Sequence, residues 1–490
     1  MQALRHSRRY RTEQPGGVEF KDQTSITAQR AREHYKSKGD PGALIRKSSN
    51  SPVNDSKCIS SSLPLAGAMP WLGEELISPS VIRSQLYGQF MDIYLPKTRL
   101  DHFSFFQRIA TMPTDESALL ESLDALSLVT VGSLHKDKTL LNLSARTYGK
   151  ALGSLAKAFS KPAQAVHSDD LLAATTVLAS CALYDEIGQH ADGWNKHVRG
   201  CQQLIAARGP ESIKSELSLL LVSNTRHGAL CGALIDRKAP LMARPDWRAV
   251  ALNSPVQDSS TLFYDTAIQI PGVLERLDQL IQDPNLPTPH GETTASDVDD
   301  LIQECERLES ELRDWFADWQ LRALLDQTFT PLEGGILYTE RPIDDFPTFT
   351  SLCSDRTFDT AFTFPSFPVA YLASLYWMCL YFLRTSMQGL RKLRHEIDEN
   401  WCPEADSAVV EDELLMYVIN LCRCLPFFCE PVSANTGQVG IFLPMRTAAI
   451  YFTSHGHWEY AKWIGAVRDS VFVKGLSPPY VGEPPGRSTR

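Results

Sequence analysis

Residues 168–187, SDDLLAATTVLASCALYDEI, contain no glycine or proline and no charged residue between Asp170 and Asp185. Such a run is typical of a helix that is buried on nearly all sides, and the leading Ser168-Asp169-Asp170 is typical of a helix N-terminus. After a short loop, residues 194–210, WNKHVRGCQQLIAARGP, end in a glycine and a proline, which together terminate a helix. The two stretches predict consecutive helices in a helical core.

Apolar residues recur at helical spacing through most of the chain from about Ser78 onward. Predicted helices span residues 78–95, 115–134, 137–159, 168–187, 191–207, 215–235, 297–327, 367–394, 408–427, 442–454 and 456–473. Residues 250–262 and 283–296 are predicted to be loops, and 330–366 an irregular, proline-bearing segment. Because no run alternates long enough to predict a sheet, the sequence predicts an all-α fold.

Charge divides the chain into a basic start and an acidic body. The 490 residues carry a net charge of −10, but residues 1–47 hold 11 Lys/Arg against 5 Asp/Glu, so the remainder carries −16. A protein that is basic throughout is therefore excluded, whereas a basic arm on an acidic body is expected. The predicted parts are 1–40, a disordered basic arm; 41–77, a flexible linker; 78–475, one large multi-helix domain; and 476–490, a disordered tail.

The cysteines and the longest apolar run bear on the cellular compartment. Eleven cysteines are scattered along the chain, which indicates reduced, buried thiols in an intracellular protein. The N-terminal residues contain no apolar segment of the kind that a secretory signal needs. The uncharged run Thr360–Leu383 is interrupted by Pro365 and Pro368, and its continuous helical part, Val369–Leu383, is too short to span a bilayer. We therefore predict a buried core helix and no membrane association.

Most sequence signatures of enzymes are absent, including phosphate-binding glycine loops, nucleophile elbows and the HExxH zinc motif. One acidic group could bind a hard cation, as in an all-α terpene cyclase. A solvated helix N-terminus, with Ser296 or Asp297 as its cap, explains the same residues without an active site. The group consists of Asp297, Asp299, Asp300, Glu304, Glu306 and Glu309. We therefore predict no catalytic residue and no cofactor.

Two further clusters have both a chemical and a structural interpretation. Cys422, Cys424 and Cys429, with His455 and His457 downstream, have the composition of a zinc site. Residues two apart on a helix do not share a face, so we interpret the cysteines as structural thiols and predict no metal site. Six tryptophans could line a ligand pocket, but their helical spacing favours the core. They are Trp315, Trp319, Trp377, Trp401, Trp458 and Trp463.

Several helical segments, taken in their order along the chain, form a more specific pattern. Residues 194–210 contain Trp194, His197, Arg199-Gly200 and Arg208-Gly209-Pro210. The other segments are 138–160, 168–187 with Asp185-Glu186, Arg226, Pro245-Asp246-Trp247, 422–428, 442–452, 458–464 and 473–476. The series resembles the fungal-specific transcription factor family, the large regulatory region that usually follows a six-cysteine binuclear zinc cluster.

The N-terminus resembles the segment that directly follows that cluster, with Tyr10-Arg11 and Phe20-Lys21-Asp22-Gln23-Thr24 in the matching places. The first cysteine is Cys58, beyond this segment, so we expect that the cluster is either truly missing or lost through a misplaced start. The basic side chains here could neutralise phosphates or form a tail without function. They are Arg5, Arg8, Arg9 and Arg11, with His6 and Tyr10 beside them.

The three-residue step from Trp194 to His197 places both side chains on one helix face, near Cys201. We expect Trp194 to pack inside and His197 to be a hydrogen-bonded structural residue. Asp185 and Glu186 could pair with a nearby arginine, Arg199.

The resemblance implies a nuclear transcriptional regulator of RNA polymerase II genes, such as nutrient-use or secondary-metabolite genes. It would act through a helical body that forms homo- or heterodimers with zinc-cluster regulators or senses a small-molecule effector. Promoter DNA would be contacted through a missing module or a partner. The alternative is an interaction or ligand-sensing protein that lacks the cluster and modulates a full-length relative. Which residues would contact DNA is unknown.

Overall fold

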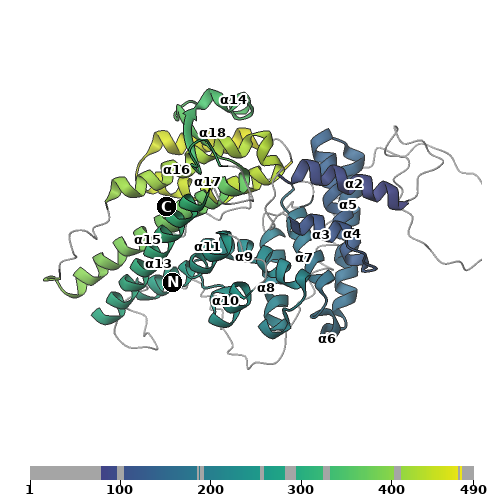
Figure 1. Cartoon of the computed structure of the whole chain (residues 1–490), viewed down its shortest axis with the longest axis horizontal. Coiled ribbons are helices and arrows are strands. Elements are labelled where there is room, and N and C mark those ends of the chain that lie inside the picture. Colours follow the sequence, from purple (N-terminus) through teal and green to yellow (C-terminus); the bar gives the residue numbers. More distant parts are fainter. Residues whose placement is uncertain are drawn as a thin grey trace, which may run out of the picture. The chain divides into compact units, whose positions relative to one another are not determined.

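The computed structural model describes residues 79–96, 104–184, 187, 193–253, 259–281, 294–323, 331–401, 410–472 and 475–476. These residues are mostly helical, which confirms the predicted all-α fold (Figure 1). The helices are α2 (Pro79–Tyr94), α3 (Ser104–Thr111), α4 (Ser117–His135), α5 (Lys138–Phe159), α6 (Pro162–Ala165), α7 (Asp169–Cys181), α8 (Gly193–Arg208), α9 (Glu216–Asp236), α10 (Pro245–Leu252), α11 (Ser259–Ala267), α12 (Ile270–Ile281), α13 (Ala295–Arg322), α14 (Pro347–Leu352), α15 (Phe367–Ile397), α16 (Glu411–Cys429), α17 (Ala434–Ser454) and α18 (Trp458–Val471).

The helices form two neighbouring groups within one compact unit. In Figure 1, α2 to α8 lie at one end and α13 to α18 at the other, with α9, α10 and α11 between them. In the first group α4 contacts α2, α5 and α7, and α7 contacts α8; in the second, α15 contacts α13 and α16, and α16 contacts α17. Sequence neighbours therefore pack against each other, and α9 is placed to meet both groups.

The segment predicted to be irregular contains a small sheet. Strand β1 (Thr339–Pro342) pairs antiparallel with β2 (Thr360–Thr363), and Thr339 lies opposite Thr363. The prediction of no sheet is wrong here because strands of four residues are too short to show an alternating pattern. Ala361 and Phe362 of β2 are buried, and the strand contacts α16.

The long uncharged run Thr360–Leu383 is divided between β2 and the first half of α15. From Phe367 to Tyr381 every side chain of α15 is buried except Tyr371, which is half-buried. In the described residues one helix, α4, is long and apolar enough to cross a membrane, but 72% of its apolar window is buried within the unit. Both segments have the burial of core helices.

Local signals in the sequence set several helix ends where they were predicted. The Ser168 hydroxyl accepts a hydrogen bond from the Leu171 N–H and caps α7. Helix α8 ends at Arg208, and Gly209 follows with φ +75° and ψ 155°, a conformation that favours glycine.

Other boundaries differ from the prediction. Two helices, α11 and α12, fall largely in the region between residues 250 and 283 that the sequence left without a helix. Helix α17 begins at Ala434 instead of residue 442, because the helix continues through the glycines of ANTGQVG. A side chain at Gly437 would clash with the Phe428 carbonyl oxygen of α16, so the glycine permits this close helix contact. Leu476, assigned by sequence to the tail, is buried and forms a β-bridge with Tyr184.

Candidate functional site

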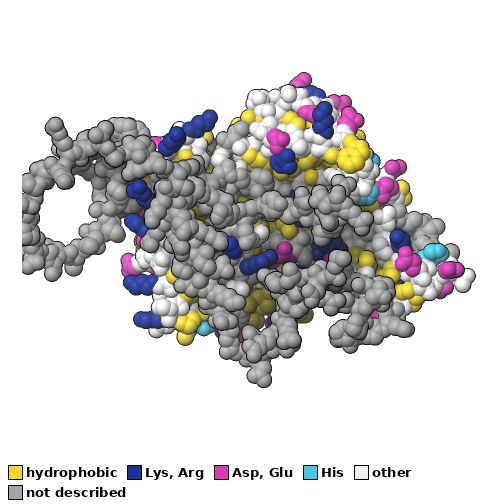
Figure 2. Space-filling view, turned by 180° about the vertical axis from the view of Figure 1, so that it is seen from behind, with side chains coloured by type: hydrophobic (Ala, Val, Ile, Leu, Met, Phe, Trp, Pro, Cys, Tyr) yellow, Lys and Arg dark blue, Asp and Glu magenta, His cyan; other side chains and the backbone are white. Residues whose placement is uncertain are grey.

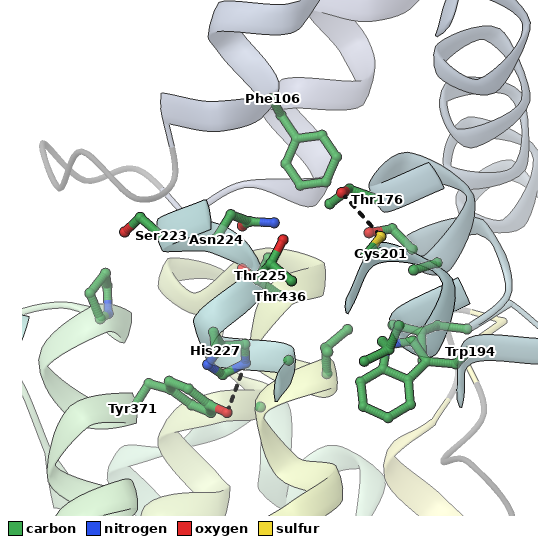
Figure 3. Close-up of a pocket in the computed structure, with 18 of the residues that line it drawn as sticks. Phe106, Thr176, Trp194, Cys201, Ser223, Asn224, Thr225, His227, Tyr371 and Thr436 are labelled. Carbon is green, nitrogen blue, oxygen red and sulfur yellow. Dashed lines mark hydrogen bonds between the residues drawn. The ribbon is translucent and has the colours of Figure 1, made fainter. Parts of the chain in front are cut away.

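A cavity of about 210 Å³ lies between the two groups of helices. Its walls come mainly from α7, α8 and α9 on one side and from α15 and α17 on the other, and Figure 3 shows side chains from these helices converging on it. Among the residues that line it are Phe106, Trp194, Cys201, His227, Tyr264 and Tyr371.

The described wall of this cavity contains no Asp, Glu, Lys or Arg. Aromatic rings supply much of its apolar surface, while hydroxyl, amide and imidazole groups supply the polar surface. A cavity of about 150 Å³ is large enough to hold a benzene molecule, so this one has room for a small ring with a polar substituent. An uncharged wall favours an uncharged ligand, because an unpaired buried charge is costly.

A chain of hydrogen bonds centred on His227 provides the polar side of the cavity. The His227 ring lies between two tyrosines, with Nδ1 3.0 Å from the Tyr264 hydroxyl and Nε2 3.1 Å from the Tyr371 hydroxyl. The Tyr371 hydroxyl is also 3.6 Å from the Cys231 sulfur. These residues come from α9, α11 and α15, so the hydrogen bonds join the central helices to the second group.

Burial keeps the tyrosine hydroxyl and the cysteine thiol next to His227 protonated. It holds the pKa of Tyr371 well above its ordinary value and raises the pKa of Cys231 to about 11. Across the cavity, burial raises the pKa of Cys201 to about 12, and its sulfur lies 3.5 Å from the Thr176 hydroxyl (Figure 3). The thiols and phenols are therefore neutral hydrogen-bonding groups at pH 7 and are suited to hold a ligand.

The predicted face of α8 borders this cavity. Trp194 is half-buried and, with Cys201, lines the wall. His197 lies one turn after Trp194 and its Nε2 is 2.7 Å from the Tyr148 hydroxyl of α5. Burial lowers the pKa of His197 to about 4, so the ring is neutral and acts as a structural hydrogen-bonding group.

Other residues of the family-like segments hold the helices together. The buried Arg208 side chain donates to Asp169 at 2.5 Å and to the His167 carbonyl oxygen at 2.8 Å, which joins the end of α8 to the start of α7. Trp247 is buried, and the guanidinium of the buried Arg226 lies 5.9 Å from the centre of the Tyr264 ring.

Arg199 forms an exposed ion pair with Asp236 at 3.1 Å. The predicted partners Asp185 and Glu186 lie outside the described residues.

The acidic group of α13 is part of an ion-paired seam, which we define as the contact between α13 and α15. The helix cap is Thr294, not Ser296 or Asp297. The Thr294 hydroxyl accepts from the Asp297 N–H, and the Asp297 carboxylate accepts from the Thr294 N–H. The hydrogen bonds from Thr294 lower the pKa of Asp297.

Farther along α13, acids face arginines of α15. Glu304 bonds to Arg307 of its own helix at 2.9 Å, and Asp300 is exposed. The pairs across the seam are Glu309 with Arg384 at 2.8 Å, Glu306 with Arg391 at 3.4 Å and Asp299 with Arg394 at 3.0 Å. Most of the acidic group therefore has a structural partner.

The cysteines and histidines with zinc-like composition lie in α16 and around the end of α17. Cys422, Cys424 and Cys429 are buried free thiols, and burial raises the pKa of Cys422 and Cys424. His455 and His457 both stack on Tyr451. Within the described residues, no three His, Cys, Asp or Glu side chains form a group that could hold a metal ion.

Five of the six tryptophans have the packing that the sequence predicts. Trp315, Trp319, Trp377 and Trp463 are buried, and the half-buried Trp401 packs against the core. The prediction is wrong for Trp458, which is 64% exposed, because it occupies the first position of α18 on the solvent side. None of the six lines the cavity, whose tryptophan is Trp194.

All predictions for the N-terminal region lie outside the described residues. They concern the parts 1–40 and 41–77, Cys58, the basic residues from Arg5 to Arg11, and the segments Tyr10-Arg11 and Phe20–Thr24. The segment 473–476 is described only at Gly475 and Leu476.

Sequence reasoning missed the centre of the cavity, the trio His227, Tyr264 and Tyr371. A signal was available in α9, where the polar run from Ser223 to His227 lies between two apolar stretches of the helix. Tyr371 lies inside an apolar run and gives no such signal.

The described residues form a helical unit with an uncharged cavity between its two groups of helices. Residues 89–331, about half of the chain, match the family model of the fungal specific transcription factor domain. The chain therefore belongs to the fungal-specific transcription factor family, which is a family of nuclear transcription regulators and not of enzymes. Comparisons with curated proteins and with solved structures gave no significant match.

Proposed function

We propose that this fungal transcription regulator senses a small, uncharged effector, and that the cavity beside His227 is the effector site. The observation that carries the proposal is the uncharged, partly aromatic wall with the His227–Tyr371 hydrogen bond on its polar side. Ligand sites of this kind are mostly apolar, with a few polar groups that orient the ligand. Because the walls come from both groups of helices, an occupant would bind them together.

A neutral metabolite would suit a regulator of nutrient-use or secondary-metabolite genes, which we propose as the targets, with action in the nucleus. Contact with promoter DNA would then involve a zinc-cluster module or a partner. The match to the family domain supports the general role, and the cavity supports the effector.

The effector site is tested with two probes of nearly equal size, benzyl alcohol and benzoate. Thermal unfolding of the full chain is measured with each. We expect benzyl alcohol to raise the midpoint and benzoate not to, because only the carboxylate places a charge against the neutral wall. Equal shifts with the two probes, or none with either, would contradict the proposal.

Single substitutions on α15 test whether benzyl alcohol binds in this cavity. In Tyr371→Phe the loss of one hydrogen bond, about 1 kcal/mol, should weaken benzyl alcohol binding about 5-fold. Tyr376→Phe is the matched control, since Tyr376 lies on the same helix, stacks on Phe316 and does not line the cavity. If both variants bind equally well, the ligand does not contact Tyr371.

A second candidate function is pairing with another family member, including a full-length zinc-cluster relative. It is supported by three large exposed apolar side chains, Met416, Ile450 and Trp458, on α16, α17 and the start of α18. Light scattering after gel filtration would test it. Trp458→Ala should shift a dimer toward monomer, whereas Leu321→Ala, which removes another exposed apolar side chain, should not.

A further inference from the structure

Helix α5 and its flanks form a strongly basic surface on a chain whose net charge is −10. No Asp or Glu occurs between Asp137 and Asp169, and residues 136–161 contain six basic residues against one acidic residue. All six are exposed. They are Lys136, Lys138, Arg146, Lys150, Lys157 and Lys161. Figure 2 shows Lys and Arg side chains gathered at the left edge of the face viewed, which is the end that carries α5.

These cations have no counter-ion in the described part of the chain. The arginines of the α13–α15 seam are ion-paired, but within the described residues none of the six basic side chains takes part in an ion pair. The acidic Glu121 of the neighbouring α4 accepts a hydrogen bond from Ser154 instead. The positive charge is therefore available to an outside partner.

The spacing of the basic residues places them in a line. Arg146, Lys150 and Lys157 are four and seven residues apart, so they share one face over about 16 Å. Roughly five phosphates of one DNA strand cover the same length along the duplex axis.

The residues between the cations are small. Gly149 and Gly153 are exposed, and a side chain at either would meet nothing within 4 Å. The bare backbone lets a rigid polyanion approach the helix closely.

The composition of this surface favours nucleic acid over other anionic partners. Insertion into a lipid surface requires large apolar side chains beside the cations, and protein interfaces depend on aromatic anchors. The exposed face of α5 has neither, because its remaining exposed residues are Thr139, Asn142, Gly149, Gly153 and Ala156. Small polar residues between Lys and Arg are suited to contact with a phosphate backbone.

We propose that the exposed face of α5 binds the phosphate backbone of double-stranded DNA without reading its sequence. This contact would add affinity to whatever module or partner selects the promoter. The α5 surface is separate from the cavity, so failure of either proposal leaves the other standing.

The experiment compares three full-length proteins for binding to short double-stranded DNA of arbitrary sequence as the salt concentration is varied. The test variant combines Arg146→Gln, Lys150→Gln and Lys157→Gln. The control combines Arg341→Gln, Lys392→Gln and Lys462→Gln, which removes the same charge from exposed residues away from α5. The basic N-terminal region is identical in all three proteins, so differences between them report the substituted surface.

Loss of three phosphate contacts should reduce the slope of log affinity against log salt by about 2.7. Between about 50 and 200 mM salt, the wild type should then lose about 40-fold more affinity than the test variant. The control should retain the wild-type slope. Identical slopes for the test variant and the wild type, or equal losses in the two variants, would overturn the proposal. So would a test variant that loses binding to phosphatidylserine vesicles while its DNA affinity is unchanged.

Discussion

The cavity and the α13–α15 seam are both contacts between helices distant in sequence, but different interactions hold them together. The seam joins its helices by ion pairs, with Glu309 only 6% exposed and held by Arg384 and Arg313. The cavity joins its helices by hydrogen bonds from His227 to two tyrosine hydroxyls and leaves space between them. One contact fixes the relative position of two helices, whereas the other leaves room for a ligand.

The difference follows from what a buried charge requires. A buried carboxylate must keep its partner, so a seam of ion pairs has little tolerance for rearrangement. A neutral wall can exchange one hydrogen bond for another at low cost. A regulator that responds to a ligand needs a contact that can rearrange, such as the cavity wall, next to a fixed one, such as the ion-paired seam.

Breaking the seam should have the largest effect on stability. Arg384→Met removes one of two cations from the buried Glu309 and should lower the free energy of unfolding by about 2 to 3 kcal/mol. Urea unfolding followed by circular dichroism measures the change. The double variant with Glu309→Gln should recover part of the loss, and a loss below about 0.5 kcal/mol would show that the pair is exposed in solution.

Acidification should lower the stability of the region around the cavity, because it protonates the buried His197 behind the cavity wall. Its pKa is lowered to about 4 from an ordinary 6.5, so the unfolded chain binds the proton more readily than the folded one. The stabilising effect of the neutral ring is complete above pH 6.5 and is lost as the pH falls toward 4. Between pH 7 and 5 the loss should be about 1 to 2 kcal/mol.

Unfolding of wild type and His197→Asn across this range isolates the histidine. The variant should show a weaker pH dependence, whereas His135→Asn, at an exposed position, should match the wild type. An unchanged slope in His197→Asn would contradict the burial of that ring.

Two glycines that line the cavity should respond in opposite directions to the same substitution. A side chain at Gly440 would lie 3.0 Å from the Phe367 ring. Overpacking should therefore outweigh the gain in helix propensity, and Gly440→Ala should lower the free energy of unfolding by about 1 kcal/mol. At Gly228 the nearest atoms are Val198 methyls at 3.8 Å, so Gly228→Ala should stabilise by about 0.5 to 1 kcal/mol. Calorimetry of both variants measures the signs, and equal signs would contradict the cavity geometry.

The smallest effect is expected at the exposed pair Arg199–Asp236. Its side chains are 63% and 48% exposed, so Arg199→Ala should change the free energy of unfolding by less than about 0.5 kcal/mol. The same urea measurement as for Arg384 compares an exposed pair with a buried one. A loss near that of Arg384→Met would show that exposure does not separate the two pairs.

Local chemistry made part of this structure predictable. Ser168 and Gly209 mark helix ends by rules that need only neighbouring residues, and the step from Trp194 to His197 and Cys201 gives a helix face directly. The cavity wall opposite that face could not be predicted, because it comes from α15 and α17, more than 150 residues away. Long-range packing is not visible in local sequence. For the same reason, the role of Tyr371 in an apolar run was missed, and the exposed Trp458 was wrongly predicted to lie in the core.

Hydrogen exchange of the full chain with and without benzyl alcohol tests the effector site most directly. We predict slower exchange in the segments of α8, α9, α15 and α17 that line the cavity, with α13 beyond the seam unchanged. Protection confined to other helices, under conditions where the alcohol raises the unfolding midpoint, would show that the ligand binds elsewhere and would contradict the assignment of the cavity.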